Sequence, residues 1–334
     1  MKMKKVLSLL LVVALCFGCV SMLSGCGDDS NKVVIYSSDE DYINEYFLER
    51  LKAQFPDYKI TIEYLSTGKN AAKLQNEGKN TPCDIVWGLE VGYLDNMTDL
   101  LADISAYSKD NYLEDMQMGG DKYLVAHRYS GCMVVNTQVL KDKGLATPTS
   151  YKDLLDPQYK GLVSMPDPSS SGTGYIFLKS MVNKWGEDEA FSYFQSLKSN
   201  IKDFTSSGSG PINDLLMGEV AVALGMTSQA VLQKNEGQPL EIIFDSEVGA
   251  PYTACGYGIV EGKQDKQAVK DVFDFFYNTL VQEEKDQFLP EAIFKNQEMK
   301  VEGYPTDIPY ADMAGNTAAE KERLLGIWNK KGIN

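Results

Sequence analysis

Two rounds of alternating strand-like and helix-like segments constrain this fold more than any other feature of the sequence. The first round contains the apolar runs 33–38, 59–68 and 83–88, separated by helix-like segments. The first of these helices places Ile43, Phe47 and Leu51 on one face. Strands that alternate with helices form a parallel sheet that is covered on both faces. This pattern predicts an α/β fold.

The alternation is interrupted twice. At Tyr123–Thr137 two strand candidates follow each other without a helix, and a second round of alternation then runs to residue 245. The glycine-punctuated segment Ser246–Gly262 reads as the return crossing. We therefore expect two α/β domains with two interdomain crossings and a central ligand cleft, one formed by residues 32–128 plus 250–295 and the other by residues 129–249 plus 296–334.

The N-terminus has the pattern of a lipoprotein signal. Three lysines precede an apolar run from Val6 to Leu23, and Leu23-Ser24-Gly25-Cys26 resembles the bacterial lipobox. The alternative, a retained membrane helix, fits less well because the run is marginal in length. We expect residues 1–25 to be removed, Cys26 to be lipidated, and residues 26–31 to tether the protein to the outer face of the bacterial cytoplasmic membrane.

Composition excludes some partners. Loss of Lys2, Lys4 and Lys5 with the signal lowers the count of Lys and Arg from 32 to 29, against 47 Asp and Glu, which gives a net charge of −18. Nucleic acid is therefore not expected as a partner. Cys83, Cys132 and Cys255 remain in the mature chain, and their odd number and wide spacing indicate neither a disulfide framework nor a zinc site.

Small hydroxyl residues follow five of the predicted strands. Ligands of open α/β sheets bind beyond the carboxyl ends of the strands, and helix N-termini attract anions. Ordinary helix capping explains one or two such segments, but five facing one cleft favour an anion site lined with hydrogen-bond donors. The segments are Ser37-Ser38, Ser66-Thr67-Gly68, Ser169–Thr173, Ser206–Ser209 and Thr227-Ser228.

Catalytic and metal signatures are weak. The sequence has one histidine, His127, within a strand-like run, and no GxSxG nucleophile elbow. The acidic residues Asp39, Glu40 and Asp41 fit the first turn of a helix better than an acid/base pair. No two of the 19 tyrosines are adjacent, which argues against a tyrosinate iron site. We expect a binding protein without cofactor or metal, and not an enzyme.

Several segments carry a family resemblance. The lipobox, SYKDLLDPQYKGLVSMPDPSSSGTGY, TSSGSGPINDLLMGEVAVALG and IIFDSEVGAPY resemble the type 2 solute-binding lipoproteins of bacterial ABC importers. The branch concerned contains ferric-iron, hexose-phosphate and 2-aminoethylphosphonate binders, and the resemblance covers nearly the whole mature chain. It implies hinge closure around a solute and delivery to a membrane permease.

The resemblance also implies roles for particular residues. In phosphate-type members the segment matching Ser169–Thr173 holds the anion, the first strand end joins it, and the residue matching Glu247 contacts hydroxyl or amine groups. Iron members carry a tyrosine pair where this chain has Thr227-Ser228. The expected ligand-binding residues are Ser37, Ser38, Thr67, Gly68, Ser170, Ser171, Gly172, Thr173, Ser207, Thr227, Ser228, Glu247 and Tyr252.

We expect a monomer that takes a small anionic solute, either a phosphonate or a sugar phosphate. A ferric-iron-binding protein of the same importer class is the first alternative. A surface enzyme acting on phosphate esters and a ligand-sensing lipoprotein that signals to a membrane kinase are alternatives from other classes. The aromatic residues Trp87, Tyr93, Tyr129 and Tyr252 either wall the cleft or pack in the core.

Overall fold

The computed structural model describes residues 29–334, so the predicted signal and Cys26 lie outside the described part of the chain. Nine strands form one hydrogen-bonded sheet: eight follow each other in the order β2-β1-β3-β9-β4-β7-β5-β6, and the ninth, β8, pairs with β4 off this path. The strands are β1 Lys32–Ser37, β2 Lys59–Tyr64, β3 Ile85–Glu90, β4 Leu124–Asn136, β5 Val163–Pro166, β6 Ile201–Thr205, β7 Val222–Met226, β8 Leu240–Ile243 and β9 Tyr252–Ile259.

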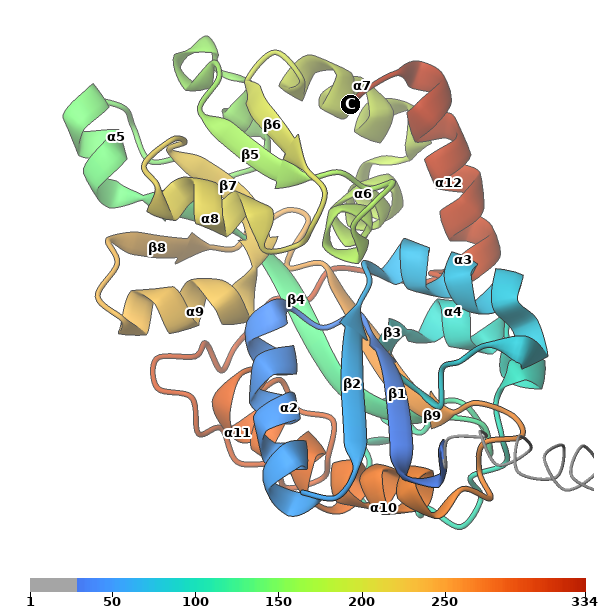
Figure 1. Cartoon of the computed structure of the whole chain (residues 1–334). Helices are drawn as coiled ribbons and strands as arrows, with labels where there is room; N and C mark the ends of the chain where they lie inside the picture. Colours follow the sequence, from blue (N-terminus) through green and yellow to red (C-terminus); the bar gives the residue numbers. More distant parts are fainter. Residues whose placement is uncertain (1–28) are drawn as a thin grey trace, which may run out of the picture.

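Strand β4 joins the two halves of this series. Its first part, up to Ser130, pairs antiparallel with β9, and its second part, from Gly131, pairs antiparallel with β7 and β8. We call the half with β1, β2, β3 and β9 lobe 1 and the half with β5, β6, β7 and β8 lobe 2 (Figure 1). The segment expected to hold two successive strands is thus a single strand that serves both lobes.

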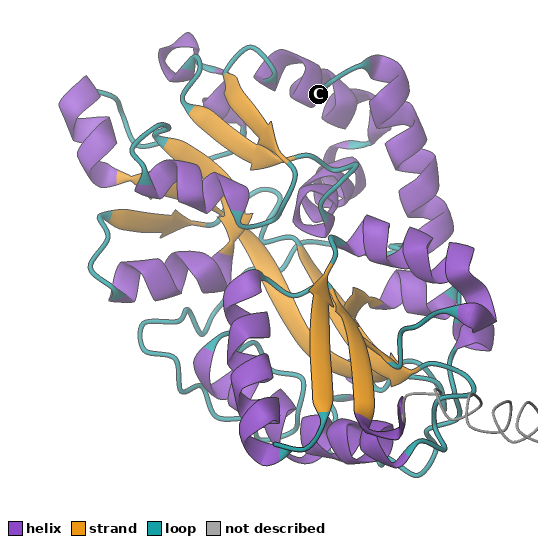
Figure 2. Ribbon diagram, viewed as in Figure 1, coloured by secondary structure: helices purple, strands orange, loops and turns teal. Residues whose placement is uncertain are grey.

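Helices cover both halves of the series (Figure 2). They are α2 Asp41–Gln54, α3 Thr67–Glu77, α4 Val91–Asp95, α5 Thr137–Lys143, α6 Gly172–Trp185, α7 Glu187–Leu197, α8 Gly210–Leu216, α9 Thr227–Asn235, α10 Gln267–Phe275, the π-helical turn Phe276–Leu280, α11 Val281–Gln287 and α12 Ala318–Lys331. None of the helices in residues 29–334 is long and apolar enough to cross a bilayer.

Side-chain alternation along β1 explains why its sheet is covered on both faces. Val33 and Ile35 point into one core with Phe47 of α2, and Tyr36 points into another core with Leu74 of α3. The strands β1, β2 and β3 are parallel, as the strand and helix rhythm predicts. The antiparallel strands β9 and β4 make the complete sheet mixed.

Close packing at the crossing requires a glycine. A Cβ placed on Gly131 would lie 2.7 Å from Phe177 Cζ of α6 and 3.1 Å from Cγ of Pro251, which precedes β9. The position where β4 changes its pairing partners is therefore packed against both lobe 2 and the return crossing. A larger residue there would force these elements apart.

Candidate functional site

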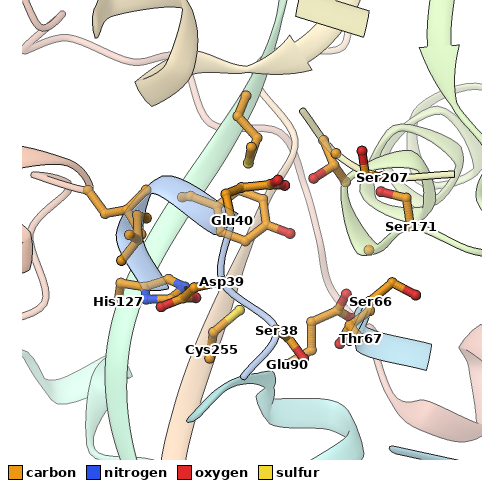
Figure 3. A pocket seen from close by; sticks show the side chains of 18 of the residues that line it. Ser38, Asp39, Glu40, Ser66, Thr67, Glu90, His127, Ser171, Ser207 and Cys255 are labelled. Carbon is orange, nitrogen blue, oxygen red and sulfur yellow. Dashed lines mark ion pairs between the residues drawn. The ribbon is translucent and has the colours of Figure 1, made fainter. Parts of the chain in front are cut away.

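A cavity lies between the two lobes. It is built at the carboxyl ends of strands from both lobes, where the chain enters the next helix or loop. Its lining comprises Ser38, Asp39, Glu40, Tyr42, Ile43, Tyr64, Ser66, Thr67, Gly88, Glu90, His127, Tyr129, Ser171, Gly172, Thr173, Ser207, Gly208, Met226, Cys255 and Leu289 (Figure 3).

Lobe 1 contributes hydroxyl groups at the start of α3. Ser66 is the N-cap residue of this helix, but its side chain makes no capping hydrogen bond. The side-chain oxygens of Ser66 and Thr67 are buried and have no hydrogen-bond partner within residues 29–334. Buried hydroxyls without a partner are uncommon in folded proteins. Together with the free N–H groups of the first turn, they offer donors to a group in the cavity.

Lobe 2 contributes the start of α6. The Ser171 hydroxyl accepts a hydrogen bond from the Gly174 N–H at 3.4 Å, so Ser171 caps the helix. The N–H groups of Gly172 and Thr173 lie in the first turn, where a helix supplies no acceptors. Figure 3 shows Ser171 and Ser207 facing Ser66 and Thr67 across the cavity. The serine-rich segment is thus both a cap and a cavity wall.

Carboxylates also line the cavity, whereas no Lys or Arg of the described chain does. Glu40 is the N-cap residue of α2, and burial raises its pKa although the nearby Ser209 opposes the shift. Glu90 ends β3, and its Oε1 is buried without a hydrogen-bond partner in the described chain. Neutral donors and acidic acceptors therefore occupy one cavity. This combination suits a solute that carries both an anionic group and hydrogen-bond donors.

A buried charge network forms one side of the cavity. His127 Nδ1 lies 3.2 Å from Glu284 Oε1, and His127 Nε2 lies 3.5 Å from Asp39 Oδ1. Lys285 Nζ lies 2.9 Å from Glu284 Oε2, and Trp87 Nε1 donates to Asp39 Oδ2 at 2.5 Å. All five side chains are buried. Burial is the largest influence on the pKa of Asp39 and raises it to about 7, although His127 opposes the shift.

Asp39, His127 and Glu284 bring ligand-type atoms within 4.8 Å of one another, a spacing that a metal site would need. The two ring nitrogens of His127 face different carboxylates, and a single metal ion takes only one of them. The second oxygen of Glu284 already contacts the Lys285 ammonium group, whose charge opposes a cation. We therefore assign these residues to an ion-pair network.

Asp39 should make folding stability depend on pH. Between pH 5 and 6 the folded protein keeps the Asp39 proton, because the pKa is about 7, whereas an unfolded aspartate with pKa 3.8 has lost it. Folding then takes up a proton, so stability decreases as the pH rises and levels off above 7. In urea unfolding experiments, the free energy of unfolding of wild type should decrease by about 1.4 kcal/mol from pH 5 to pH 6, relative to that of Asp39→Asn. Parallel pH profiles would contradict the assignment.

The structure brings six of the predicted binding residues to the cavity: Ser38, Thr67, Ser171, Gly172, Thr173 and Ser207. Five others do not line it but stand within two residues of a lining residue in the sequence. The Ser37 hydroxyl accepts from the Asp39 N–H, and Gly68 packs near the Tyr93 hydroxyl. Thr227 is buried with its hydroxyl 2.9 Å from that of Ser130, while Ser170 and Ser228 have buried hydroxyls without a partner in the described chain.

Two predicted residues lie away from the cavity. Glu247 is half-exposed and pairs with Lys152 at 3.3 Å, an arrangement that matches a solvent-facing carboxylate. Tyr252 packs edge-on against Tyr310 at a ring distance of 5.0 Å. Neither side chain lines the space between the lobes.

Sequence reasoning missed the acidic part of the site. The acidic run predicts that Asp39 and Glu40 lie in the first turn of a helix, but α2 begins at Asp41 and both residues line the cavity. The apolar run predicts a third strand that ends at Gly88, but the strand continues to Glu90. An acidic residue at the end of an otherwise apolar run was the available signal.

Comparisons with known proteins agree with this architecture. The model of the family described as bacterial extracellular solute-binding protein matches residues 47–291. An uncharacterised protein of Haemophilus influenzae is 29% identical over 265 residues, which cover 76% of this chain and 75% of the relative. This match shows relatedness along most of both chains.

Solved structures extend the comparison to nearly the whole fold. The periplasmic binding protein AfuA from Actinobacillus pleuropneumoniae, with exogenous fructose-6-phosphate bound, is 26% identical with a TM-score of 0.78, and the match covers 90% of this chain and 98% of that one. Apo ferric ion-binding protein A of Pasteurella haemolytica is 18% identical with a TM-score of 0.69, covering 91% and 98%. The chain belongs to the bacterial extracellular solute-binding proteins and has the two-domain α/β fold of the type 2 periplasmic binding proteins that serve ABC importers.

Proposed function

We propose that this protein is the solute-binding lipoprotein of an ABC importer, that it captures a small phosphonate or sugar phosphate between its lobes, and that it delivers this solute to a membrane permease. One observation carries the proposal. The start of α3 faces the start of α6, on the opposite lobe, across one cavity, and the Ser66 and Thr67 hydroxyls at the start of α3 have no partner in the described part of the chain. An anion bound between them satisfies donors of both lobes and stabilises the closed form.

The absence of Lys and Arg from the described lining favours a ligand held by oriented neutral donors. A tetrahedral phosphoryl or phosphonyl group offers several acceptor oxygens to the hydroxyls and to the free N–H groups of the two helices. The protein binds this group without chemical change. The two lobes are joined at β4 and at the return crossing, and they close on the solute by a hinge movement about these two connections.

Glu40 and Glu90 favour a solute with donors on its second half. Carboxylates accept hydrogen bonds from an ammonium group or from sugar hydroxyls, and inorganic phosphate carries neither of these groups. Both 2-aminoethylphosphonate and a hexose phosphate meet this requirement. The similarity to a protein whose structure was determined with fructose-6-phosphate supports the second of these.

Calorimetric titration tests the proposal. Protein freed of co-purified solute is titrated with 2-aminoethylphosphonate, glucose 6-phosphate, fructose 6-phosphate, inorganic phosphate and ferric citrate. Mass spectrometry identifies the solute that the untreated protein retains. We expect saturable one-to-one binding of an organic phosphonate or phosphate, tighter than that of inorganic phosphate. Failure of every organic phosphate and phosphonate would overturn the proposal.

Ferric iron is expected to bind weakly and without colour. Tyrosinate coordination of iron produces visible charge-transfer absorbance, but Thr227 and Ser228 supply no phenol groups at the start of α9. The ferric citrate arm, monitored by visible spectroscopy, checks this prediction. Stoichiometric binding with a visible band would replace the phosphate assignment by the iron alternative.

The lipid anchor gives a separate prediction. Cys26→Ser should release the protein into the medium or leave its signal uncleaved, because lipid supplies the membrane affinity of a lipoprotein. Detergent phase partitioning of wild type and variant measures this change. Wild-type protein in the aqueous phase would contradict lipidation, and Cys83→Ser serves as a control for the loss of a cysteine.

A further inference from the structure

Helix α12 contacts both lobes. Leu324 and Trp328 lie in the core of lobe 2, where the Trp328 ring packs 5.2 Å from that of Phe194. The same helix contacts α4 of lobe 1 as well as α6 of lobe 2. Figure 1 shows α12 running from lobe 2 down to α3 and α4. The first turns of α12 therefore place side chains at the boundary between the lobes.

Lys321 is the side chain of α12 that reaches across this boundary. It is 5% exposed, and its Nζ lies 2.6 Å from Oε2 of Glu90, the last residue of β3. The ammonium group lies 4.7 Å from the ring centre of Tyr93 on α4 and 4.6 Å from that of Tyr175 on α6. One buried cation thus contacts lobe 1 and lobe 2 together. Separation of the lobes would break this arrangement.

Glu90 lies between two cavities. Its Oε1 has no hydrogen-bond partner in the described chain, and a Cβ added at Gly172 would lie 1.8 Å from this oxygen. A second, smaller cavity adjoins Glu90 on the α12 side and is lined by Glu90, Gly92, Tyr93, Thr253, Asn316, Thr317, Ala318 and Lys321. One carboxylate oxygen therefore faces the start of α6, while the other is held by α12.

We propose that Lys321 is a positioning residue for the solute cleft. From α12 it orients and neutralises Glu90 across the lobe boundary. Closure on a solute and docking of α12 against lobe 1 are therefore coupled. This inference rests on the proposed function, because it takes the anionic character of the solute from it. A buried carboxylate without its cation would repel an anion held at the neighbouring start of α6. The ion pair removes this repulsion and leaves Glu90 Oε1 to accept from the solute.

The main test compares substitutions of lysine on one helix. Lys321→Met should weaken binding of the organic phosphate or phosphonate found by calorimetry by about 5- to 150-fold, the usual range of coupling between sites. Lys330→Met is the matched control, because Lys330 is exposed on the last turn of α12 and has no contact with Glu90. Lys321→Arg, which keeps the charge, should recover most of the affinity. An unchanged affinity in Lys321→Met would overturn the proposal.

A double-mutant cycle separates positioning from simple support of the fold. In the Glu90→Gln background no carboxylate charge remains to be neutralised, so Lys321→Met should cost much less affinity than it does in wild type. Equal losses in both backgrounds would show that Lys321 acts independently of Glu90 and would contradict the proposal. Thermal melts of each variant identify any loss of folding.

Hydrogen exchange tests the coupling without a solute. In the ligand-free protein, amides in the first turns of α12 should exchange faster in Lys321→Met than in Lys330→Met, because the contact with lobe 1 is lost. Equal protection would overturn the proposal. This measurement also separates the two hypotheses. A wild-type protein that binds no phosphate or phosphonate refutes the proposed function. The exchange comparison still decides the role of Lys321 in that case.

Discussion

Lys285→Met is expected to lower the free energy of unfolding by about 3 to 5 kcal/mol, the cost of leaving one partner of a buried ion pair uncompensated. Lys285 Nζ lies 2.9 Å from Glu284 Oε2, and both side chains are completely buried. Burial lowers the pKa of Lys285, although Glu284 opposes the shift. Burial alone would raise the pKa of Glu284, but attraction to Lys285 and His127 outweighs it and lowers the pKa to about 2. Without Lys285, Glu284 keeps one ion-pair partner within residues 29–334, namely His127, and it also faces Asp39.

Chemical denaturation of wild type and variants measures this effect. The double variant Glu284→Gln/Lys285→Met should recover a large part of the lost stability, because it removes both charges together. Lys300→Met is the matched surface control, since Lys300 pairs with Asp286 at 2.8 Å but is half-exposed, and its loss should change stability little. If Lys285→Met and Lys300→Met have similar effects, the buried network contributes little to folding.

Thr173→Val should weaken binding of the organic phosphate or phosphonate by roughly 10- to 150-fold, which corresponds to about 1.5 to 3 kcal/mol for one hydrogen bond to a charged group. Thr173 is 3% exposed and lines the cavity in the first turn of α6. Valine keeps the shape of threonine and removes only the hydroxyl group. Thr173 also contacts the buried Tyr129 hydroxyl, so a loss of stability in the solute-free variant is measured separately from the loss of affinity.

If Ser171 mainly caps the helix, Ser171→Ala should lower folding stability and not solute affinity. Its hydroxyl accepts the Gly174 N–H, so its removal should cost about 0.5 to 2 kcal/mol of folding stability. Calorimetry combined with thermal melts of the solute-free proteins separates the two effects. If Thr173→Val binds every tested phosphate and phosphonate as wild type does, α6 does not hold the anion through this hydroxyl.

The periodicity of the sequence was sufficient to predict many of the strands and helices. The apolar run at residues 33–38 became β1, the segment entered at Pro211 became α8, and the helix from Thr227 became α9. Such patterns are local, because side chains that share a face of a strand or helix are separated by fixed steps along the chain. The continuity of β4 was not predictable in this way, since it depends on pairing with β9 on one side of Gly131 and with β7 and β8 on the other.

The alternating α/β architecture, the change of rhythm at β4 and the hydroxyl residues at the strand ends can be read from the sequence, because each follows from residues close together along the chain. Which strand ends meet depends on tertiary packing. It brought Ser38, Thr67 and Ser171 to one cavity, and it left Glu247 at the surface. It also placed Glu90 against Lys321, 231 residues later in the sequence. Contacts of this length depend on how two lobes pack, and no local pattern encodes them.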